Sequence, residues 1–141
     1  MRINTKCSLA LHVLLLLAVF SDASKMTSDK IAGSTGCNPV IIRNLLGDLK
    51  KAGLVNVQRG SGGATLSMAP KDISIWRVCE AVDPDSLTNL IGLHQNPSQE
   101  CPVGSKIHEL LKDSYGMIEL AVKESMTAFT LEELLKKYKK I

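Results

Sequence analysis

The chain lacks the residue groupings that mark most metal centres and enzyme active sites. Its four cysteines are far apart and form no C-x-x-C pair, so a zinc-finger type of site has no support. It contains no paired carboxylates in a plausible pocket, no activated Ser or Cys with a well-placed His, and no glycine-rich loop between a strand and a helix. We therefore expect neither a metal site nor an enzyme. The cysteines are Cys7, Cys37, Cys79 and Cys101.

A strong excess of charge is also missing. The 141 residues include 17 Lys and Arg and 14 Asp and Glu, which gives a net charge of +3. Any nucleic-acid surface must therefore come from the local placement of basic residues and not from bulk basicity. With 45% hydrophobic and 22% charged residues, the composition is that of a single globular unit.

No apolar run is long enough to span a bilayer. The longest, residues 9–20, is interrupted by His12; it follows a basic start and precedes small residues, so it resembles an export signal. Because of its interruption and its shortness, we expect instead a core helix over residues 4–20, with His12 in the core or at its boundary. The protein is then expected to be cytoplasmic, without a membrane partner, and its cysteines to be reduced thiols.

Residues 27–53 have the pattern of a helix-turn-helix. Thr27 and Ser28 can cap a first helix, whose free N–H groups are a natural contact for a DNA phosphate. Gly36 falls where the chain must turn sharply. Asn38 followed by Pro39 predicts the N-cap and first turn of a second helix. Gly53 then ends that helix, as a C-terminal glycine commonly does.

The second helix is amphipathic. On a helical wheel, one side gathers Ile42, Leu45, Leu46 and Leu49. The opposite side is small, polar and basic, as a helix in the major groove requires, and an ordinary helix with a solvated face would show the same pattern. Arg43 and Asn44 can pair with base edges. The outward residues are Val40, Asn44, Gly47 and Lys51, with Arg43 and Lys50 on a flank.

A hairpin follows the second helix. Residues 54–58 and 64–68 alternate as half-buried strands do, and residues 59–63 supply the turn between them. Arg59 is the only long side chain at a tip that also holds Gly60, Ser61 and Gly62, so we expect it to reach into a narrow minor groove. Alone, such a tip more often means a tight turn. Directly after a helix-turn-helix it predicts a winged helix, with double-stranded DNA as the partner.

The next segment predicts a short helix. Ser74 opens it, residues 75–82 form it, and Asp83 followed by Pro84 ends it. Trp76, the only tryptophan, is interpreted as a core or interface residue and not as a base-stacking platform. The helix is expected to pack on the base of the hairpin. Its apolar face consists of Ile75, Val78, Cys79 and Val82.

The C-terminal part predicts one long and one short helix. Residues 103–127 carry apolar side chains at helical spacing, interrupted only at 114–116, and such a helix is roughly 35 to 40 Å long. Because a small head cannot cover that length, we expect its apolar stripe to bury against a second copy. Thr130 and Glu133 form a capping box for the last helix, whose terminal lysines are interpreted as solvated.

Several of these stretches resemble one family. The opening MRINTK, the string IAGSTGCNPVIIRNLLGDLKKAGLV, the RGSGG tip and the ISIWRVCEAVD helix look like the Rrf2 family of bacterial winged-helix repressors, relatives of IscR, NsrR and CymR, and most of all its YwnA-like members. The resemblance covers residues 1 to about 83 well, and later residues in pattern only. It implies a cytoplasmic homodimer on a palindromic operator, with the second helix in the major groove and the hairpin in the minor groove.

By motif position, Val40 and Arg43 correspond to the family's base-reading residues and Arg59 to its wing arginine. Two departures stand out. The family's acidic base-reader is Arg43 here, which changes the expected operator sequence. Its usual RGPGGGY wing is RGSGGAT, without the proline and tyrosine.

Many members hold an iron–sulfur cluster through three closely spaced cysteines before the long helix. Here residues 86–101 contain Cys101 alone, with His94 and Glu100 nearby, so we expect no cluster and no cofactor. Cys101 precedes Pro102 at an expected helix start, where the helix dipole lowers a thiol pKa. It is a candidate redox-sensing thiol, and an inert cysteine is the alternative.

The sequence therefore predicts a mainly α protein with a small β-hairpin wing. We expect a winged helix-turn-helix DNA-binding domain over residues 1–83, a loop over 84–101 and a helical dimerisation region over 102–141. The expected function is a sequence-specific, DNA-binding transcriptional regulator, a homodimeric repressor. The alternative is a winged-helix protein-interaction module that has lost DNA binding. The expected DNA contacts are Thr27, Ser28, Asn38, Pro39, Val40, Arg43, Asn44, Gly47, Lys50, Lys51, Arg59, Gly60, Ser61 and Gly62.

Overall fold

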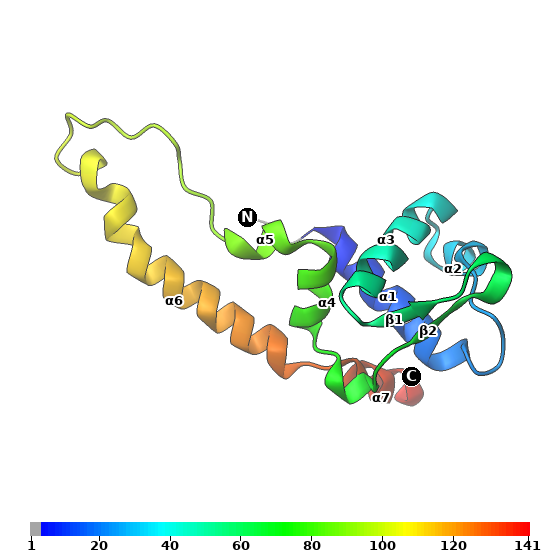
Figure 1. Ribbon diagram of the computed structural model, residues 1–141. Coiled ribbons are helices and arrows are strands. Elements are labelled where there is room, and N and C mark those ends of the chain that lie inside the picture. The colour runs from blue at the N-terminus through cyan, green and yellow to red at the C-terminus, as the bar shows by residue number, and fades with distance from the viewer. Residues whose placement is uncertain (1–3) are drawn as a thin grey trace.

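The computed structural model describes residues 4–141 and consists of a head from which one long helix projects (Figure 1). Residues 1–3 lie outside the described residues. They are part of the MRINTK string that carries some of the family resemblance. Helix α1 (Thr5–Phe20) runs through the head and packs against α2, α4, β2 and α7. The side chain of Asn4 caps it by accepting a hydrogen bond from the amide of Lys6, at 3.0 Å.

The predicted core helix is confirmed, since five α1 side chains are buried: Cys7, Ala10, Val13, Leu14 and Leu17. His12 is the exception to the apolar pattern. It is exposed, and its Nε2 lies 3.0 Å from Ser34 Oγ of α2. The residue is thus at the boundary and not in the core, because an imidazole at the surface keeps its hydration.

Helices α2 (Ser28–Thr35) and α3 (Pro39–Lys51) form the helix-turn-helix. Thr27 is the N-cap of α2, and its Oγ1 accepts a hydrogen bond from the amide of Lys30 at 3.3 Å. Gly36 has φ +74°, a left-handed conformation that residues with a side chain rarely adopt, so the predicted turn is confirmed there. After α3, the amide of Leu54 returns to the carbonyl of Leu49 at 3.0 Å, and this closes the helix end around Gly53.

The wing is a two-stranded antiparallel sheet. Strands β1 (Val55–Val57) and β2 (Ala64–Leu66) pair with Asn56 opposite Thr65, and both are shorter than the alternating stretches predicted. Their turn contains a 3-10 helix, η1 (Gly60–Gly62). At the base, β1 packs on α3 and β2 on α1. The amide of Ala64 also donates to the carbonyl of Met26 at 3.0 Å, which places the start of α2 beside the wing.

Helix α4 (Ile75–Val82) begins and ends where predicted, with Ser74 Oγ accepting from the amide of Arg77 at 3.1 Å. Its predicted packing on the wing base is wrong. Its main contacts are with α1, α3, α5 and α6, because its buried side chains face the centre of the head, whereas the wing base rests on α1 and α3. A 3-10 helix, η2 (Pro70–Asp72), connects the wing to α4, and a short helix, α5 (Pro84–Thr88), begins the segment predicted as loop.

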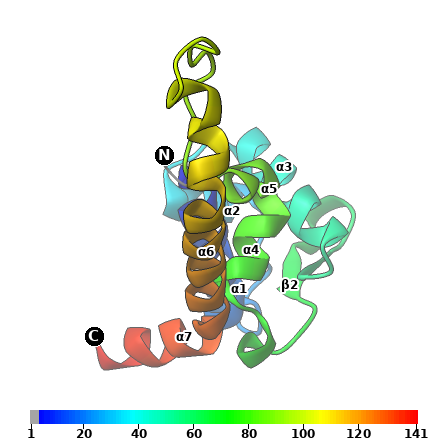
Figure 2. The same ribbon diagram turned by 90° about the vertical axis from the view of Figure 1, so that its left-hand side faces the viewer.

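Helix α6 (Ile107–Ala128) follows a 3-10 helix, η3 (Gly104–Lys106), and continues without a break through residues 114–116. Its first half extends beyond the head (Figure 2). Helix α7 (Leu131–Lys140) then returns to the head, where it packs on α1 and η2. An isolated antiparallel bridge pairs Ser74, just before α4, with Thr130, just before α7. The next residue, Leu131, is fully buried.

Among the helices of residues 4–141, none combines the length and the apolar character needed to cross a bilayer.

Candidate nucleic-acid interface

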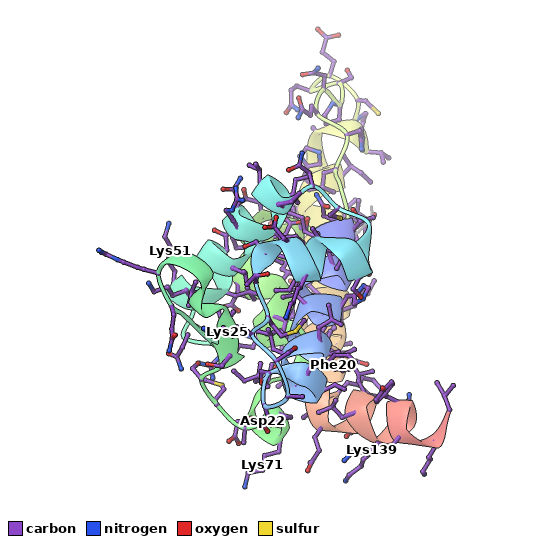
Figure 3. All side chains as sticks on the ribbon, turned by 90° about the vertical axis from the view of Figure 1, so that its right-hand side faces the viewer. Phe20, Asp22, Lys25, Lys51, Lys71 and Lys139 are labelled. Atoms are coloured by element: carbon purple, nitrogen blue, oxygen red, sulfur yellow. The ribbon has the colours of Figure 1, made fainter. Side chains whose placement is uncertain are left out.

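Helix α3 presents a continuous outward face. Its four predicted core residues are buried, whereas Arg43, Asn44, Lys50 and Lys51 are exposed to solvent. Val40 and Ile41 are also exposed, by 53% and 50%. Figure 3 shows Lys51 at the outer edge of the head. The face therefore carries an amide and three cations beside two aliphatic side chains.

The start of α3 is fixed by its own sequence. Asn38 Oδ1 accepts a hydrogen bond from the amide of Val40 at 2.8 Å, and Pro39 occupies the first helical position, where no N–H is required. The backbone of the first turn is thereby held in one orientation. Val40 lies in this fixed turn, and Arg43 and Asn44 lie in the turn that follows it. Sequence reasoning placed Asn38 and Pro39 among the DNA contacts, and in the structure both serve to position the helix.

Gly47 lies in the middle of the outward face. A Cβ atom added there would meet no atom within 4 Å, so packing within this chain does not require a glycine. A glycine inside a helix is about 1 kcal/mol less favourable than an alanine. The head itself would therefore accept a larger residue at position 47.

The wing holds Arg59 at its tip. Arg59 is exposed and immediately precedes Gly60, which has φ +71°, so the chain turns sharply after the arginine. The amide of Gln58 donates to the carbonyl of Gly63 at 3.0 Å and closes the turn. A Cβ on Gly62 would clash with the side chain of Gln58. The tip is therefore narrow, and Arg59 projects from it; the side chain of Ser61 is outside what the structure describes.

Thr27 and Ser28 are half-buried at the N-terminus of α2. The Thr27 hydroxyl is already used as the cap, so this end of the helix offers a ligand mainly its backbone N–H groups. The link between Met26 and Ala64 holds the α2 N-terminus next to the wing. Three predicted contact groups, the α2 start, the α3 face and the wing, are thus carried by one small head.

One exposed residue of this face was missed by the sequence reasoning. Ile41 was not assigned to either side of α3. On a helical wheel it lies at the edge of the apolar side, next to the buried Leu45, and its residue type also suggests a core position. Neither signal in the sequence therefore predicts its exposure, which depends on the neighbours that surround α3.

A second exposed feature is the apolar stripe of α6. None of the 22 residues of this helix is buried. Val122 and Met126 pack partly on the core, and Lys123 Nζ lies 5.4 Å from the ring of Trp76, whose Nε1 donates to Glu80 Oε2 at 2.8 Å. Apolar and small side chains follow one another along another side of the helix, and all of them are exposed. The stripe consists of Leu110, Ser114, Met117, Ile118, Ala121 and Ala128.

Cys101 is exposed in the loop before α6, and its Sγ accepts a hydrogen bond from the amide of Gly104 at 3.3 Å. The N–H groups of Gly104 and Val103 lower the pKa of the Cys101 thiol, because they stabilise the thiolate. In contrast, burial raises the pKa of Cys7 and of Cys79. Cys101 is thus chemically distinct from the two core thiols.

The residues around Cys101 do not fit an iron–sulfur cluster. Within residues 4–141, no three His, Cys, Asp or Glu side chains are placed to share one metal ion. The neighbouring imidazoles of His94 and His108 contact each other edge to face, and His108 Nε2 lies 2.8 Å from the carbonyl of His94. With one thiol in the loop, the donor set is incomplete for such a cluster.

The sequence matches the model of the Rrf2 family, described as an iron-dependent transcriptional regulator, over residues 3–137. This chain belongs to the Rrf2 family. YwnA of Bacillus subtilis (strain 168), which carries the name of an HTH-type transcriptional regulator, is 32% identical over 133 residues, covering 94% of this chain and 96% of YwnA. The family and the resemblance to YwnA predicted from the sequence are therefore confirmed.

Two solved structures are similar to this Rrf2 protein. One, named as a DNA-binding protein, has a TM-score of 0.74 at 31% identity and covers 92% of this chain and 98% of its own. The other, named as a transcriptional regulator of Lactobacillus plantarum, has a TM-score of 0.78 at 27% identity, with coverage of 96% and 90%. This Rrf2 protein is thus a transcriptional regulator with a DNA-binding winged-helix fold, and not an enzyme.

Proposed function

We propose that this Rrf2 protein is a cytoplasmic repressor that binds a palindromic operator as a homodimer. In each subunit, α3 enters the major groove and the wing follows the adjacent minor groove. The observation that carries the proposal is the outward face of α3. There Arg43 and Asn44 are exposed on the same side as the cations Lys50 and Lys51, and the wing that carries Arg59 packs on this helix. Arg and Asn are side chains that pair with guanine and adenine edges.

The remaining proposed contacts are to the backbone of the duplex. Lys50 and Lys51 lie in the last turn of α3 and are suited to phosphates, as are the N–H groups at the start of α2. Such contacts set the register of the protein on the DNA without reading its sequence. They also make binding weaken steeply as salt concentration rises.

The proposed dimer forms through α6. Nothing in residues 4–141 buries its stripe of apolar and small residues, and α6 is about 33 Å long by its number of residues. A second copy related by a twofold axis covers both stripes at once. The two heads are then placed to read half-sites one helical turn apart, which is what a palindromic operator requires.

Arg59→Ala is expected to weaken operator binding by about 1–3 kcal/mol per half-site, because the wing loses its one long cation. The operator is first selected from a random duplex pool, and affinities are measured by fluorescence anisotropy at several salt concentrations. Arg77→Ala, which removes an exposed arginine from α4, is the matched control and should bind as the parent does. Unchanged affinity of Arg59→Ala on the selected operator would refute the proposed wing contact.

Gly47→Ala is expected to raise the free energy of unfolding by about 0.5–1 kcal/mol and yet weaken binding to the operator. The methyl group has space within the head but none between α3 and a DNA groove. Gly116→Ala on α6, where an added Cβ likewise meets no atom within 4 Å, should stabilise without affecting DNA binding. Equal binding by the parent and Gly47→Ala would show that the middle of α3 does not approach the duplex closely.

The second candidate function is a protein-interaction module that has kept the winged-helix shape. It is favoured by the net charge of only +3 and by a wing without the proline and tyrosine of the family pattern. Purified protein that selects no sequence from a random duplex pool, even at low salt, would favour this function. Selection of one sequence with twofold symmetry would exclude it.

A further inference from the structure

The first turn of α3 carries two aliphatic side chains that nothing in residues 4–141 covers. Val40 and Ile41 are exposed by 53% and 50%, and neither packs against the hydrophobic core. Single exposed apolar residues are common on protein surfaces. Val40 and Ile41 are two adjacent ones in the first turn of α3, and together they form a small exposed aliphatic patch.

The surroundings of this patch indicate what can cover it. Asn44 follows Val40 by four residues and therefore lies beside it on the helix surface. Further along the helix, the exposed charged side chains are the cations Arg43, Lys50 and Lys51, and the one carboxylate, Asp48, is half-buried. This surface of α3 is aliphatic at its first turn and cationic in later turns, so it does not match the α6 stripe, where apolar residues repeat over several turns. The α3 surface is instead complementary to an anionic polymer that has local apolar groups.

Double-stranded DNA has one such group in its major groove, the C5-methyl of thymine. The other base edges there present hydrogen-bond donors and acceptors. An aliphatic side chain pressed against them would remove their water without replacing its hydrogen bonds, which is unfavourable. Val and Ile therefore discriminate for thymine and against bases whose polar groups would be left unpaired.

We propose that Val40 and Ile41 read thymine methyl groups, so that each half-site has thymine under the first turn of α3. This inference rests on the proposed function of α3 as the helix in the major groove. Arg43 and Asn44 then select neighbouring bases by hydrogen bonds. The Asn38 cap and Pro39 hold the aliphatic turn in place, because they fix the first backbone turn from which both side chains project.

The test replaces thymine by deoxyuridine, which differs only by the missing methyl group. In the selected operator, each thymine of a half-site is replaced in turn, and affinity for the full-length protein is measured by fluorescence anisotropy. One or two positions per half-site should each show a loss of about threefold to fivefold, the value expected for one buried methyl group. Thymines outside the half-sites should show none.

Two variants assign the effect to the side chains. Val40→Ala and Ile41→Ala should each bind the thymine operator more weakly, and each should lose the difference between thymine and deoxyuridine at one position. Val103→Ala removes a valine that is 63% exposed but lies before α6, and it should keep the full difference. Circular dichroism and thermal unfolding confirm that the variants fold.

Equal affinity of the parent protein for the thymine and deoxyuridine operators would overturn the inference while leaving DNA binding intact. A methyl effect that persists unchanged in both variants would overturn it as well, since another residue would then be the reader. If the parent protein selects no operator at all, the proposed function fails, and the inference with it.

Discussion

Met117→Glu is expected to convert the proposed dimer into a monomer. Met117 is 73% exposed in the single chain and lies in the middle of the α6 stripe between Ser114 and Ala121. In a twofold interface each substitution occurs twice, so two carboxylates would be buried near each other without partners. Sedimentation equilibrium measures the result directly, as a shift from twice the mass of the chain to its single mass.

The same variant should lose operator affinity by a factor of about 10² to 10⁴, since the two heads no longer act as one linked unit. Thr127→Glu is the matched control: it adds the same charge to the same helix, on a side away from the stripe, and should remain dimeric. A Met117→Glu protein that is still a dimer would place the interface elsewhere. A parent protein that is monomeric at micromolar concentration would exclude the dimer itself.

Ile42→Ala is expected to lower the free energy of unfolding by about 2–5 kcal/mol. Ile42 is fully buried in α3, and its removal leaves a cavity between the reading helix and the rest of the core. For a domain whose total stability is about 5–15 kcal/mol, this is a large fraction. Urea unfolding at a fixed protein concentration gives the value, because dimerisation makes apparent stability concentration-dependent.

The neighbouring Ile41→Ala provides the control within the same helix turn. Ile41 is half exposed and should change stability by less than about 0.5 kcal/mol. An equal loss of unfolding free energy in the two variants would mean that Ile41 is buried in solution and does not belong to the outward face of α3. The pair thus distinguishes Ile42, which packs α3 onto the core, from Ile41, which faces solvent.

The sequence was most informative where structure is decided locally. Asn38 and Pro39 start α3, Ser74 starts α4 and Gly36 makes the turn, because caps, ring constraints and left-handed glycines act within a few residues. The burial of Ile42 and its partners also followed from helical periodicity. These signals sufficed to place most of the candidate DNA contacts on one helix and one hairpin.

What the sequence could not provide depends on contacts between distant segments. The packing of α4 on α1 and α3 is set by how three helices meet, and an apolar face alone does not name its partner. The exposure of Ile41 likewise depends on which neighbours surround α3. Residues 114–116 interrupt the apolar pattern of α6 but not its backbone, since neither Ser114 nor Gly116 prevents a helix from continuing.

The backbone pairing of Ser74 with Thr130 has a consequence for biosynthesis. It joins two points that are far apart along the chain, and the fully buried Leu131 completes the interior behind them. Closing so long a segment carries an entropic cost and cannot happen while the later residues are still in the ribosome. The side of α1 that α7 covers therefore stays exposed to solvent in the nascent chain until α7 has left the ribosome.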